Sequence, residues 1–518
     1  MTRHEQTTPD ARSHAVVIGA GLGGLAAAMR LGAQGWRVTV VDRLDVPGGR
    51  ASSISSGGHR FDLGPTIVTA PSVFQRLWAA CGLRFEDDVD LRPLDPFYRI
   101  AWPDGSHLDC TGDEERMAEE VARLSPSDVA GWRRFLRDSE ARYRVGYEGM
   151  LTKPMHRLRA TAEVLPTFAR LRADESIHTL ASKRVKDARL RMALSFHPLF
   201  IGGDPTKVTS MYALVSHLEA KEGVHYCMGG VGAMAWAMAG VVARQGGSVR
   251  LGAQVDSIVL DGGRAAGVRL TDGASIHADA VVSNADPGHL YDTLLRDAPR
   301  KRWTKRRLKR SKWSMGLFVW HFGTEGTRDL WPEVGHHTIL SGPRYTGLLR
   351  DVFREGRLAE DMSLYVHRPS VTDPTSAPKG GDTFYALSPV PHLGHRDPVR
   401  WAEEAERYRR RVQDVLEERL LPGLGARVTQ SMCLTPEDFR ARYLSPHGSG
   451  FSIEPRILQS AWFRPHNLSE EVPGLYLVGA GTHPGAGLPG VVASAEVVAA
   501  LVPPANAVEA PAFREAAE

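Results

Sequence analysis

The first hydrophobic segment of the chain is interrupted by a cluster of glycines. Before them, HAVVI at residues 14–18 is apolar and rich in β-branched residues, which predicts a buried strand. After them, LAAAMRL is rich in alanine and leucine, which favours a helix that ends near Gly35. WRVTVV at residues 36–41 predicts a second strand. The order of strand, glycine turn, helix and strand indicates the beginning of a Rossmann-like α/β fold.

The glycines of this turn have the spacing G-x-G-x-x-G. We expect Gly19 to make the turn, Gly21 to let the backbone approach a pyrophosphate, and Gly24 to let the helix pack on the strand. The positive helix N-terminus would hold the phosphate. Asp42 ends the second strand, where an acid can bind ribose hydroxyls and would repel a 2′-phosphate. Together these features predict a dinucleotide site.

A second glycine loop decides which dinucleotide is expected. In PGGR, Gly48 and Gly49 allow close backbone approach, and Arg50 can offset diphosphate charge or support a ring system. Nicotinamide enzymes have no general need for this loop, whereas a flavin bound along its whole length does. An ordinary surface arginine is less favoured directly after two glycines. The segment RFDLGPTIVTAP predicts a further loop beside the flavin, at Gly64, Pro65 and Thr66.

The same kind of interruption returns near the C-terminus. GAGTHPGAGLPG, residues 479–490, holds five glycines and two prolines between the apolar runs GLYLV and VVASAEVVAALV. Glycine and proline at this density are incompatible with regular structure. We therefore expect backbone, between a buried strand and a buried helix, to come close to a bound molecule.

The length of the chain indicates more than one domain, because 518 residues exceed one ordinary core. The cofactor motifs lie at both ends, and a middle stretch alternates short β runs with turns, so the FAD-binding domain is expected to be discontinuous. It would comprise residues 14–95, 225–300 and 455–505. Residues 95–225 and 300–455 would form the substrate-binding and helical region, with flexible tails at 1–13 and 506–518.

Several segments carry a family resemblance. They are VVIGAGLGGLAAAMRL, VDRLDVPGGR, HRFDLGPTIVTAP, ALSFHPLFIGGDP, GVHYCMGG, VVSNADP, SMGLFVWHFGT, FSIEPRILQSAWFRPHN and LYLVGAGTHPGAGLPGVVASAEVVA. Together they resemble bacterial, FAD-dependent phytoene desaturases of the CrtI type over residues 14–502. The resemblance implies an α/β architecture with a Rossmann-like FAD-binding domain, an α+β substrate domain and a helical membrane-facing part. It also implies desaturation of phytoene to neurosporene or lycopene, with hydride transfer to flavin N5 and loss of a proton.

The resemblance also implies further cofactor-binding residues. The helix that starts near Gly490 would point its N-terminal amides at the N1/O2 edge of the flavin and stabilise negative charge there. Backbone at Val255 would meet the adenine, and Asn284 would lie near the cofactor. The remaining positions implied around the C-terminal loop are Gly481, Thr482, Val491 and Val492.

A polyene substrate would have to be taken from a lipid bilayer. No run of 18 uninterrupted apolar residues exists, so we expect binding to the membrane surface rather than spanning. The net charge is only +4, yet nine of the thirteen residues from Arg300 to Lys312 are Lys or Arg. This run, with Trp303 and Trp313, could meet anionic headgroups; a solvated helix face is the alternative, and no nucleic-acid partner is expected. The segment 150–172 is a second candidate contact, or else an amphipathic helix pair broken at Pro166.

The residue that removes the proton is not evident from the sequence. His197, Asp204, Asp138 and Glu140 are candidates, but none is assigned as catalytic. The aromatic residues Phe318, Trp320 and Trp462 could line a polyene tunnel, although burial in a core is the default. No metal site or disulfide framework is expected, since the four cysteines lie far apart without a CxxC pair.

Other functions remain open at this level. A sibling carotenoid desaturase, ketolase or isomerase would share the same motifs, and a prenyl-lipid binding protein without redox chemistry would share the fold. Four intact cofactor motifs argue against the latter. The expected electron acceptor is quinone or oxygen, and the expected location is the cytoplasmic side of the bacterial inner membrane.

Overall fold

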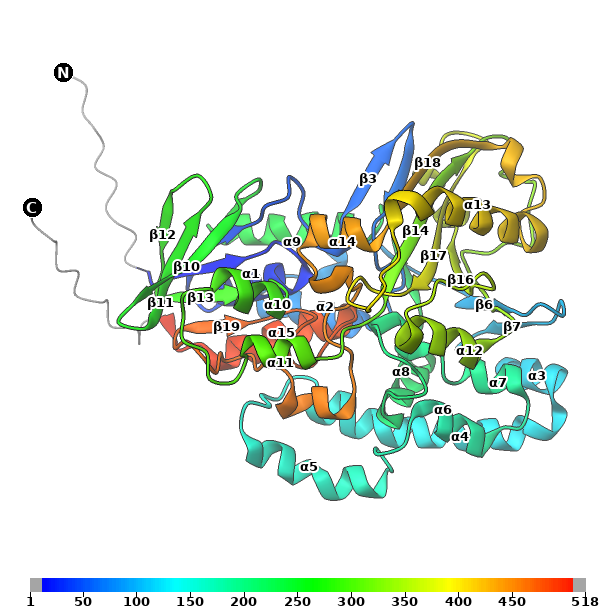
Figure 1. Ribbon diagram of the computed structural model, residues 1–518, viewed down its shortest axis with the longest axis horizontal. Helices are drawn as coiled ribbons and strands as arrows, with labels where there is room; N and C mark the ends of the chain where they lie inside the picture. Colours follow the sequence, from blue (N-terminus) through cyan, green and yellow to red (C-terminus); the bar gives the residue numbers. More distant parts are fainter. Residues whose placement is uncertain (1–11, 506–518) are drawn as a thin grey trace, which may run out of the picture.

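The computed structural model describes residues 12–505; residues 1–11 and the C-terminal tail predicted at 506–518 lie outside this range. At its centre is a parallel five-stranded sheet of order β19-β13-β1-β2-β9 (Figure 1). The strands come from three distant parts of the chain: β1 (His14–Ile18), β2 (Arg37–Val41), β9 (Ser248–Arg250), β13 (Ala280–Ser283) and β19 (Leu475–Leu477). The strand–helix–strand unit predicted at the N-terminus is present, with α1 at Leu22–Ala33.

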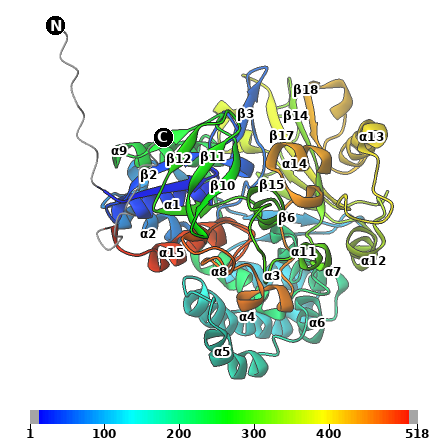
Figure 2. The same cartoon turned by 60° about the vertical axis from the view of Figure 1, so that its left-hand side comes forward.

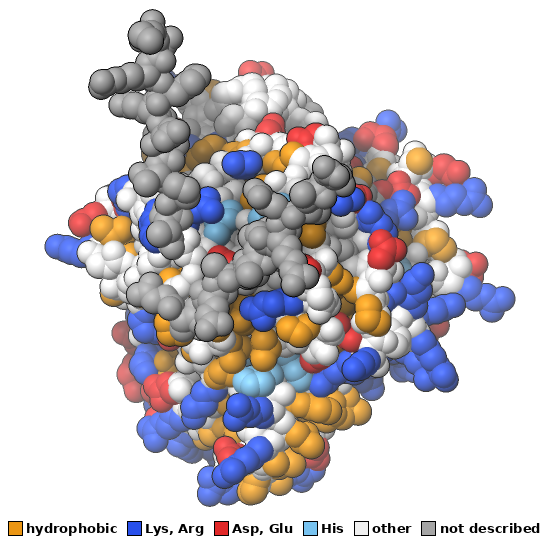
Figure 3. Space-filling model, turned by 90° about the vertical axis from the view of Figure 1, so that its left-hand side faces the viewer, with side chains coloured by type: hydrophobic (Ala, Val, Ile, Leu, Met, Phe, Trp, Pro, Cys, Tyr) orange, Lys and Arg blue, Asp and Glu red, His pale blue; other side chains and the backbone are white. Residues whose placement is uncertain are grey.

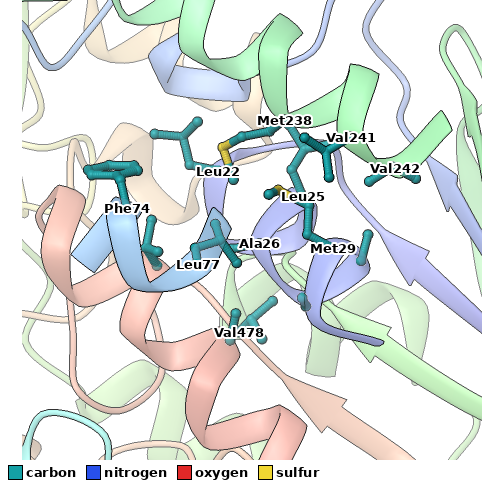
Figure 4. Close-up of a cluster of buried hydrophobic side chains, with 14 of the residues drawn as sticks. Leu22, Leu25, Ala26, Met29, Phe74, Leu77, Met238, Val241, Val242 and Val478 are labelled. Atoms are coloured by element: carbon teal, nitrogen blue, oxygen red, sulfur yellow. The ribbon is translucent and has the colours of Figure 1, made fainter. Parts of the chain in front are cut away.

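The central strand β1 is buried on both faces, which explains its uninterrupted apolar sequence. Ala15 and Val17 point to one side, where helices cover the sheet, and Val16 and Ile18 point to the other. The helices are α1, α2 (Pro71–Ala80), α9 (Val231–Arg244) and α15 (Leu488–Leu501). Figure 4 shows how side chains of α1, α2 and α9 meet there: Leu22, Leu25, Ala26 and Met29 with Phe74, Leu77, Met238, Val241 and Val242.

An antiparallel three-stranded sheet covers the opposite face of the central sheet (Figure 2). Its strands follow the predicted middle segment: β10 (Val255–Asp261), β11 (Arg264–Leu270) and β12 (Ser275–His277). Ile258 and Val268 of this sheet pack against Val16 and Val281 of the central one. The β-turn-rich region of the sequence therefore forms a layer that packs on one face of the parallel sheet.

The second large layer is a seven-stranded sheet of order β18-β14-β17-β16-β15-β6-β7. Its only parallel pair in the described part of the chain is β15 with β6. The strands are β6 (Tyr98–Ala101), β7 (His107–Cys110), β14 (Gly316–Thr324), β15 (His337–Leu340), β16 (Leu364–His367), β17 (Asp382–Val390) and β18 (Val428–Leu434). One face packs on α13 (Trp401–Arg419), and the other face lines a cavity.

Helices gather below both sheets in Figure 1. They are α3 (Glu114–Leu124), α4 (Val129–Tyr143), α5 (Leu158–Arg170), α6 (Ile177–Arg184), α7 (Ala188–Ala193) and α8 (Leu214–Glu222). The remaining helices are α10 (Pro287–His289), α11 (Lys305–Arg310), α12 (Tyr345–Arg350) and α14 (Pro436–Tyr443), and the short strands are β3 (Ser53–Ser56), β4 (His59–Asp62), β5 (Leu91–Pro93) and β8 (His225–Cys227). Within residues 12–505, no helix combines the length and the apolar character that crossing a bilayer requires.

Two expectations for the peripheral segments were wrong. Helix α5 continues through Pro166 instead of breaking there. Pro166 and Ala162, four residues earlier, both face solvent, so water can replace the hydrogen bond that proline removes. Trp303 and Trp313 are not interfacial either, because both are buried in the core beside the three-stranded sheet.

Candidate active site

One cavity of about 1090 Å³ connects the central sheet with the seven-stranded sheet. At one end, its lining comes from the loops that follow β1, β2, β13 and β19, which all leave the same edge of the parallel sheet. In parallel α/β sheets, ligands bind at this edge. The glycine-rich segments at the two ends of the sequence thus meet at a single site.

The first glycine loop presents an uncapped helix N-terminus to the cavity. Gly19 has a φ of +96°, a conformation that favours glycine, and α1 then begins after Gly21 with no side-chain cap. Gly21 and Gly23 line the cavity, so the free backbone N–H groups of the first turn are available there. Gly24 does not line the cavity. It packs against the loop instead, where a Cβ would lie 2.0 Å from the carbonyl oxygen of Gly19. The loop fits a pyrophosphate.

Asp42 holds this loop in place and also faces the cavity. Its carboxylate accepts hydrogen bonds from the backbone N–H of Ala20 at 2.6 Å and of Leu44 at 2.8 Å. Burial raises the pKa of Asp42 and outweighs these two hydrogen bonds, which lower it. Val255 lines the same end of the cavity. This arrangement leaves room for the predicted contact with a ribose and an adenine.

The second glycine loop brings a half-buried cation to the lining of the cavity. Gly48 and Gly49 have φ values of +104° and +56°, and Gly48 pairs with Gly21 of the first loop. The guanidinium of Arg50 donates to Ser445 Oγ at 2.8 Å and lies over the ring of Tyr443. Burial lowers the pKa of Arg50, and the nearby carboxylate of Asp286 partly offsets this effect. The prediction that Arg50 is no ordinary surface residue fits this position.

The C-terminal loop presents a second uncapped helix N-terminus. Helix α15 begins after Gly487, whose φ is +97°, and this residue carries no side-chain cap. Residues 487–491 line the cavity, and a Cβ at Gly490 would lie 2.6 Å from the carbonyl oxygen of Gly485. Two positive helix ends and glycine-lined backbone therefore face one cavity. These donors fit a flavin dinucleotide, with its pyrophosphate at α1 and its ring at α15.

The structure brings most of the predicted cofactor-binding residues together. Those that line the cavity are Gly19, Gly21, Asp42, Gly48, Gly49, Arg50, Gly64, Pro65, Thr66, Val255, Asn284, Gly490 and Val491. Four do not line it: Gly24, Gly481, Thr482 and Val492. The side chain of Thr482 is turned away and donates to the carbonyl of Pro465 at 2.6 Å, and a Cβ on Gly481 would collide with Pro287. We assign these four residues to packing around the site.

Beyond the cofactor end, the cavity is lined chiefly by apolar side chains. They come from the 190–215 segment, α12, the inner face of the seven-stranded sheet and α5, and include Met192, Phe196, Phe200, Leu317, Leu349, Leu387 and Leu165. The aromatic candidates do not contribute: Phe318 and Trp320 point to the opposite face of the sheet and pack with α13. Trp462 lies under the guanidinium of Arg302. The default expectation of burial holds for the first two.

The candidates for proton removal are separated by the fold. Asp204 and Asp138 do not line the cavity, and Asp138 is bound to Arg184 at 2.6 Å. Glu140 pairs with Arg144 outside it. His197 does line the cavity, and beside it lies Glu219, which sequence reasoning missed. No local motif marks Glu219, because its partners are distant in sequence.

Comparison with known proteins shows the family to which the chain belongs. The family model for flavin-containing amine oxidoreductases matches residues 22–503. A neurosporene-forming phytoene desaturase of Cereibacter sphaeroides is 62% identical over 97% of this chain and 96% of its own length. A neurosporene-forming enzyme of Rhodobacter capsulatus is also 62% identical, over 96% and 95% of the two chains, and a lycopene-forming one of a Paracoccus species is 44% identical, over 94% and 97%.

Solved structures show the same fold at low sequence identity. An oxidoreductase of Methanosarcina mazei has a TM-score of 0.63 at 19% identity and covers 94% of this chain and 99% of its own. A cyclohexylamine oxidase of Brevibacterium oxydans has a TM-score of 0.60 at 17% identity and covers 95% and 98%. Such distant similarity concerns the architecture alone.

Proposed function

Because the chain belongs to the flavin-containing amine oxidoreductases and, within them, to the bacterial CrtI-type phytoene desaturases, we propose that it desaturates phytoene to neurosporene in carotenoid biosynthesis. The observation that carries this proposal is the single cavity that runs from a glycine-lined dinucleotide end to an apolar end. Neurosporene is favoured over lycopene as the main product because the more similar relatives are neurosporene-forming.

The cofactor is FAD, and different residues of the cavity would bind different parts of it. The α1 N-terminus would hold the pyrophosphate, Asp42 the ribose, and the α15 N-terminus the edge of the ring where negative charge develops. When bound, FAD supplies the acceptor for a hydride at N5. Arg50, a half-buried cation that lines the same cavity, would offset the charge of the diphosphate or support the ring system.

The apolar lining determines what the protein can do with a hydrocarbon. Phytoene offers no polar group for recognition, so side chains such as Phe196, Phe200 and Leu387 can only align it and exclude water. Alignment of the reacting C–H bond and a dry cavity are the main contributions available to the protein. The neighbouring alkene of the substrate can delocalise the positive charge that develops between loss of hydride and loss of proton.

The exposed apolar surface beside the cavity supports binding of the protein to a membrane surface. Helix α5 exposes an apolar stripe, Leu158, Ala162, Leu165 and Ala169, and Leu165 also lines the cavity. The segment 457–463 packs beside α5, and it exposes Ile457 and Leu458. Apolar side chains gather near lysines and arginines at the lower end of the face in Figure 3. We place this stripe in the interfacial layer of the bilayer, so that phytoene enters without crossing water.

The basic run lies next to this stripe. Arg302 and Arg307 donate to backbone carbonyls of the 457–463 segment, which ties α11 to it. Six other cations of the run are exposed, and within residues 12–505 they form no ion pair: Lys301, Lys305, Arg306, Lys309, Arg310 and Lys312. Unpaired surface cations beside an apolar stripe favour anionic headgroups. We propose peripheral binding at the cytoplasmic face of the inner membrane, with quinone or oxygen as electron acceptor.

Coexpression tests the proposed reaction. The protein is produced in a colourless bacterial host that accumulates phytoene, and the pigments are separated and identified by their spectra. Neurosporene as the main product supports the proposal. Untouched phytoene, together with conversion of another carotenoid, would favour a sibling desaturase, ketolase or isomerase. A folded protein without flavin and without any product would favour a lipid-binding role.

A further inference from the structure

Two buried side chains form a wall between the main cavity and a second cavity. The second cavity has a volume of about 670 Å³ and lies between β6, α4 and α8. Among the described residues, His197 and Glu219 alone line both cavities. Both are buried, with 5% and 4% of their surfaces exposed. This titratable pair therefore lies at the boundary between the main cavity and the second cavity.

The pair is held by short polar contacts in otherwise apolar surroundings. Nε2 of His197 lies 3.1 Å from Oε2 of Glu219, and the hydroxyl of Tyr98 donates to the same oxygen at 2.8 Å. Nδ1 of His197 and Oε1 of Glu219 are buried and have no hydrogen-bond partner among residues 12–505. In the tautomer that donates from Nε2 to Glu219, the lone pair of Nδ1 is free to accept a proton.

The second cavity leads toward solvent. Its lining includes Glu140, Arg144, Glu148 and Lys221, and the last three are exposed. In the first cavity, the sequence neighbours of His197 that line it, Phe196, Leu199 and Phe200, are apolar or aromatic. The His197–Glu219 pair therefore offers a proton released in the apolar part of the first cavity a path toward solvent through the second cavity.

We propose that His197 accepts the proton that desaturation releases, with Glu219 as its charge-balancing partner, and that the second cavity conducts this proton to solvent. This proposal rests on the function proposed above. One carbon gives up a hydride, with its electron pair, to the flavin, which is reduced. The neighbouring carbon gives up a proton to Nδ1 of His197, and the electron pair of that C–H bond forms the new double bond. The imidazolium, paired with the carboxylate of Glu219, then releases a proton to water in the second cavity.

A change in the pH dependence of turnover on altering a contact of this pair is a readout of its role, because phytoene itself does not titrate. The titratable groups that face Glu219 are His197 from the segment after α7, Tyr98 from β6 and Cys110 from β7. Burial raises the pKa of both Tyr98 and Cys110, so neither is charged near neutral pH. A shift of the rate profile on changing Tyr98, which contacts both His197 and Glu219, would therefore report on this pair.

The test uses FAD-loaded protein on phytoene-containing liposomes, with rates expressed per bound flavin. His197→Asn is expected to lower the rate by about 10²- to 10⁴-fold, the usual contribution of a general base, while flavin content stays at the wild-type level. Tyr98→Phe removes the hydroxyl donor from Glu219, makes the carboxylate more basic, and is expected to move the acid limb to higher pH. A purely structural role of Tyr98 would lower stability without this shift.

The matched control is Glu222→Gln on the same helix, since Glu222 lines neither cavity and binds Ser72. It should leave rate and pH profile unchanged. Wild-type rates in His197→Asn, or an unshifted acid limb in Tyr98→Phe, would overturn the proposal. If His197→Asn fails to fold, the profile of Tyr98→Phe decides. A flavin-loaded wild type that leaves phytoene unchanged would instead refute the proposed function.

Discussion

The side-chain amide nitrogen of Asn284 lies only 2.7 Å from the point where a Cβ on Gly21 would stand. Its amide oxygen is similarly close to the Cβ positions of Gly23 and Gly479. One side chain from the end of β13 thus packs among glycines from both ends of the chain. The missing side chains at these glycines are what allow the three segments of the flavin site to meet.

Replacing Gly21 by valine should abolish flavin binding. The branched side chain would displace Asn284 and fill the space beside the α1 N-terminus, where the pyrophosphate is expected. The measurement is the ratio of flavin absorbance to protein absorbance after purification. Stoichiometric flavin in the Gly21→Val protein would contradict the assignment of this loop.

The control for this substitution is Gly240→Ala on the exposed side of α9. A Cβ there meets nothing within 4 Å, and alanine is favoured over glycine within a helix by about 0.5–1 kcal/mol. This variant should keep its flavin and unfold at the same or a higher temperature. Circular dichroism of both variants separates loss of the cofactor from loss of the fold.

A buried histidine cluster should make stability depend on pH. Ring nitrogens of His336, His337 and His367 lie within 4.8 Å of one another, and His336 bonds His367 at 3.0 Å. Burial lowers the pKa of His336 to about 3 and that of nearby His321 to about 4. These folded-state pKa values lie below the unfolded value of 6.5, so the unfolded chain binds more protons than the folded one. The stability that these neutral histidines contribute is therefore complete above pH 6.5 and is lost as the pH falls toward the folded pKa values.

Each such histidine should cost about 1.4 kcal/mol of unfolding free energy between pH 7.5 and 5.5, because the unfolded side chain takes up its proton over this interval and the folded one does not. The melting temperature of the FAD-loaded protein, recorded over this interval, measures the effect. His336→Gln should flatten the slope whatever its effect on stability at pH 7.5. An equal slope in both proteins would show that this histidine already titrates normally in the fold.

Removing charge from α11 should weaken binding to anionic vesicles. We expect at least about tenfold weaker binding when Lys305, Arg306, Lys309 and Arg310 are changed to glutamine, since each cation near such a surface contributes about 1 kcal/mol. Sedimentation with phosphatidylglycerol vesicles measures this. The control changes four exposed arginines at the distant α13, Arg400 directly before the helix and Arg407, Arg410 and Arg411 on it, and should bind like the wild type. Equal binding by both variants would show that the basic run is a solvated helix face that does not contact the membrane.

The apolar stripe of α5 should act independently of charge. Leu158 and Leu165 are 58% and 56% exposed, and changing both to serine should weaken binding to neutral vesicles by about tenfold, given a burial energy of roughly 25 cal/mol per Å². High salt should not restore or remove this difference. Unchanged binding to neutral vesicles would exclude α5 from the membrane contact.

The cofactor end of the site could be predicted because its signals are local. The turn at Gly19, the helix after it and the acid at Asp42 follow each other within one β-α-β unit, where spacing determines geometry. The C-terminal loop could be interpreted from composition alone, since few structures need so many glycines. The individual contacts of this loop could not be predicted from its composition. Thr482, for example, points away from the cavity because the carbonyl of Pro465 offers a nearby acceptor.

His197 could be named as a candidate from the sequence, but its contacts with Glu219 and Tyr98 could not be predicted, because they depend on chain segments that tertiary packing brings together. His197 and Tyr98 are 99 residues apart, and Glu219 lies on a helix with a weak sequence pattern. The strand pattern of β14 predicts alternation but not which face meets the cavity, so Phe318 and Leu317 could not be told apart. Burial of Trp303 likewise follows from the fold of α11 onto the core, where Glu470 accepts its indole N–H.

The most direct test of the account is an anaerobic single turnover with phytoene in liposomes and no added electron acceptor. We predict that the visible absorbance of the oxidised flavin bleaches while an equivalent amount of the first desaturated carotene forms. Admitting oxygen or a quinone should then restore the flavin spectrum and allow further steps toward neurosporene. A flavin spectrum that stays unchanged while product accumulates, or bleaching without product, would contradict hydride transfer from the polyene to the flavin in this cavity.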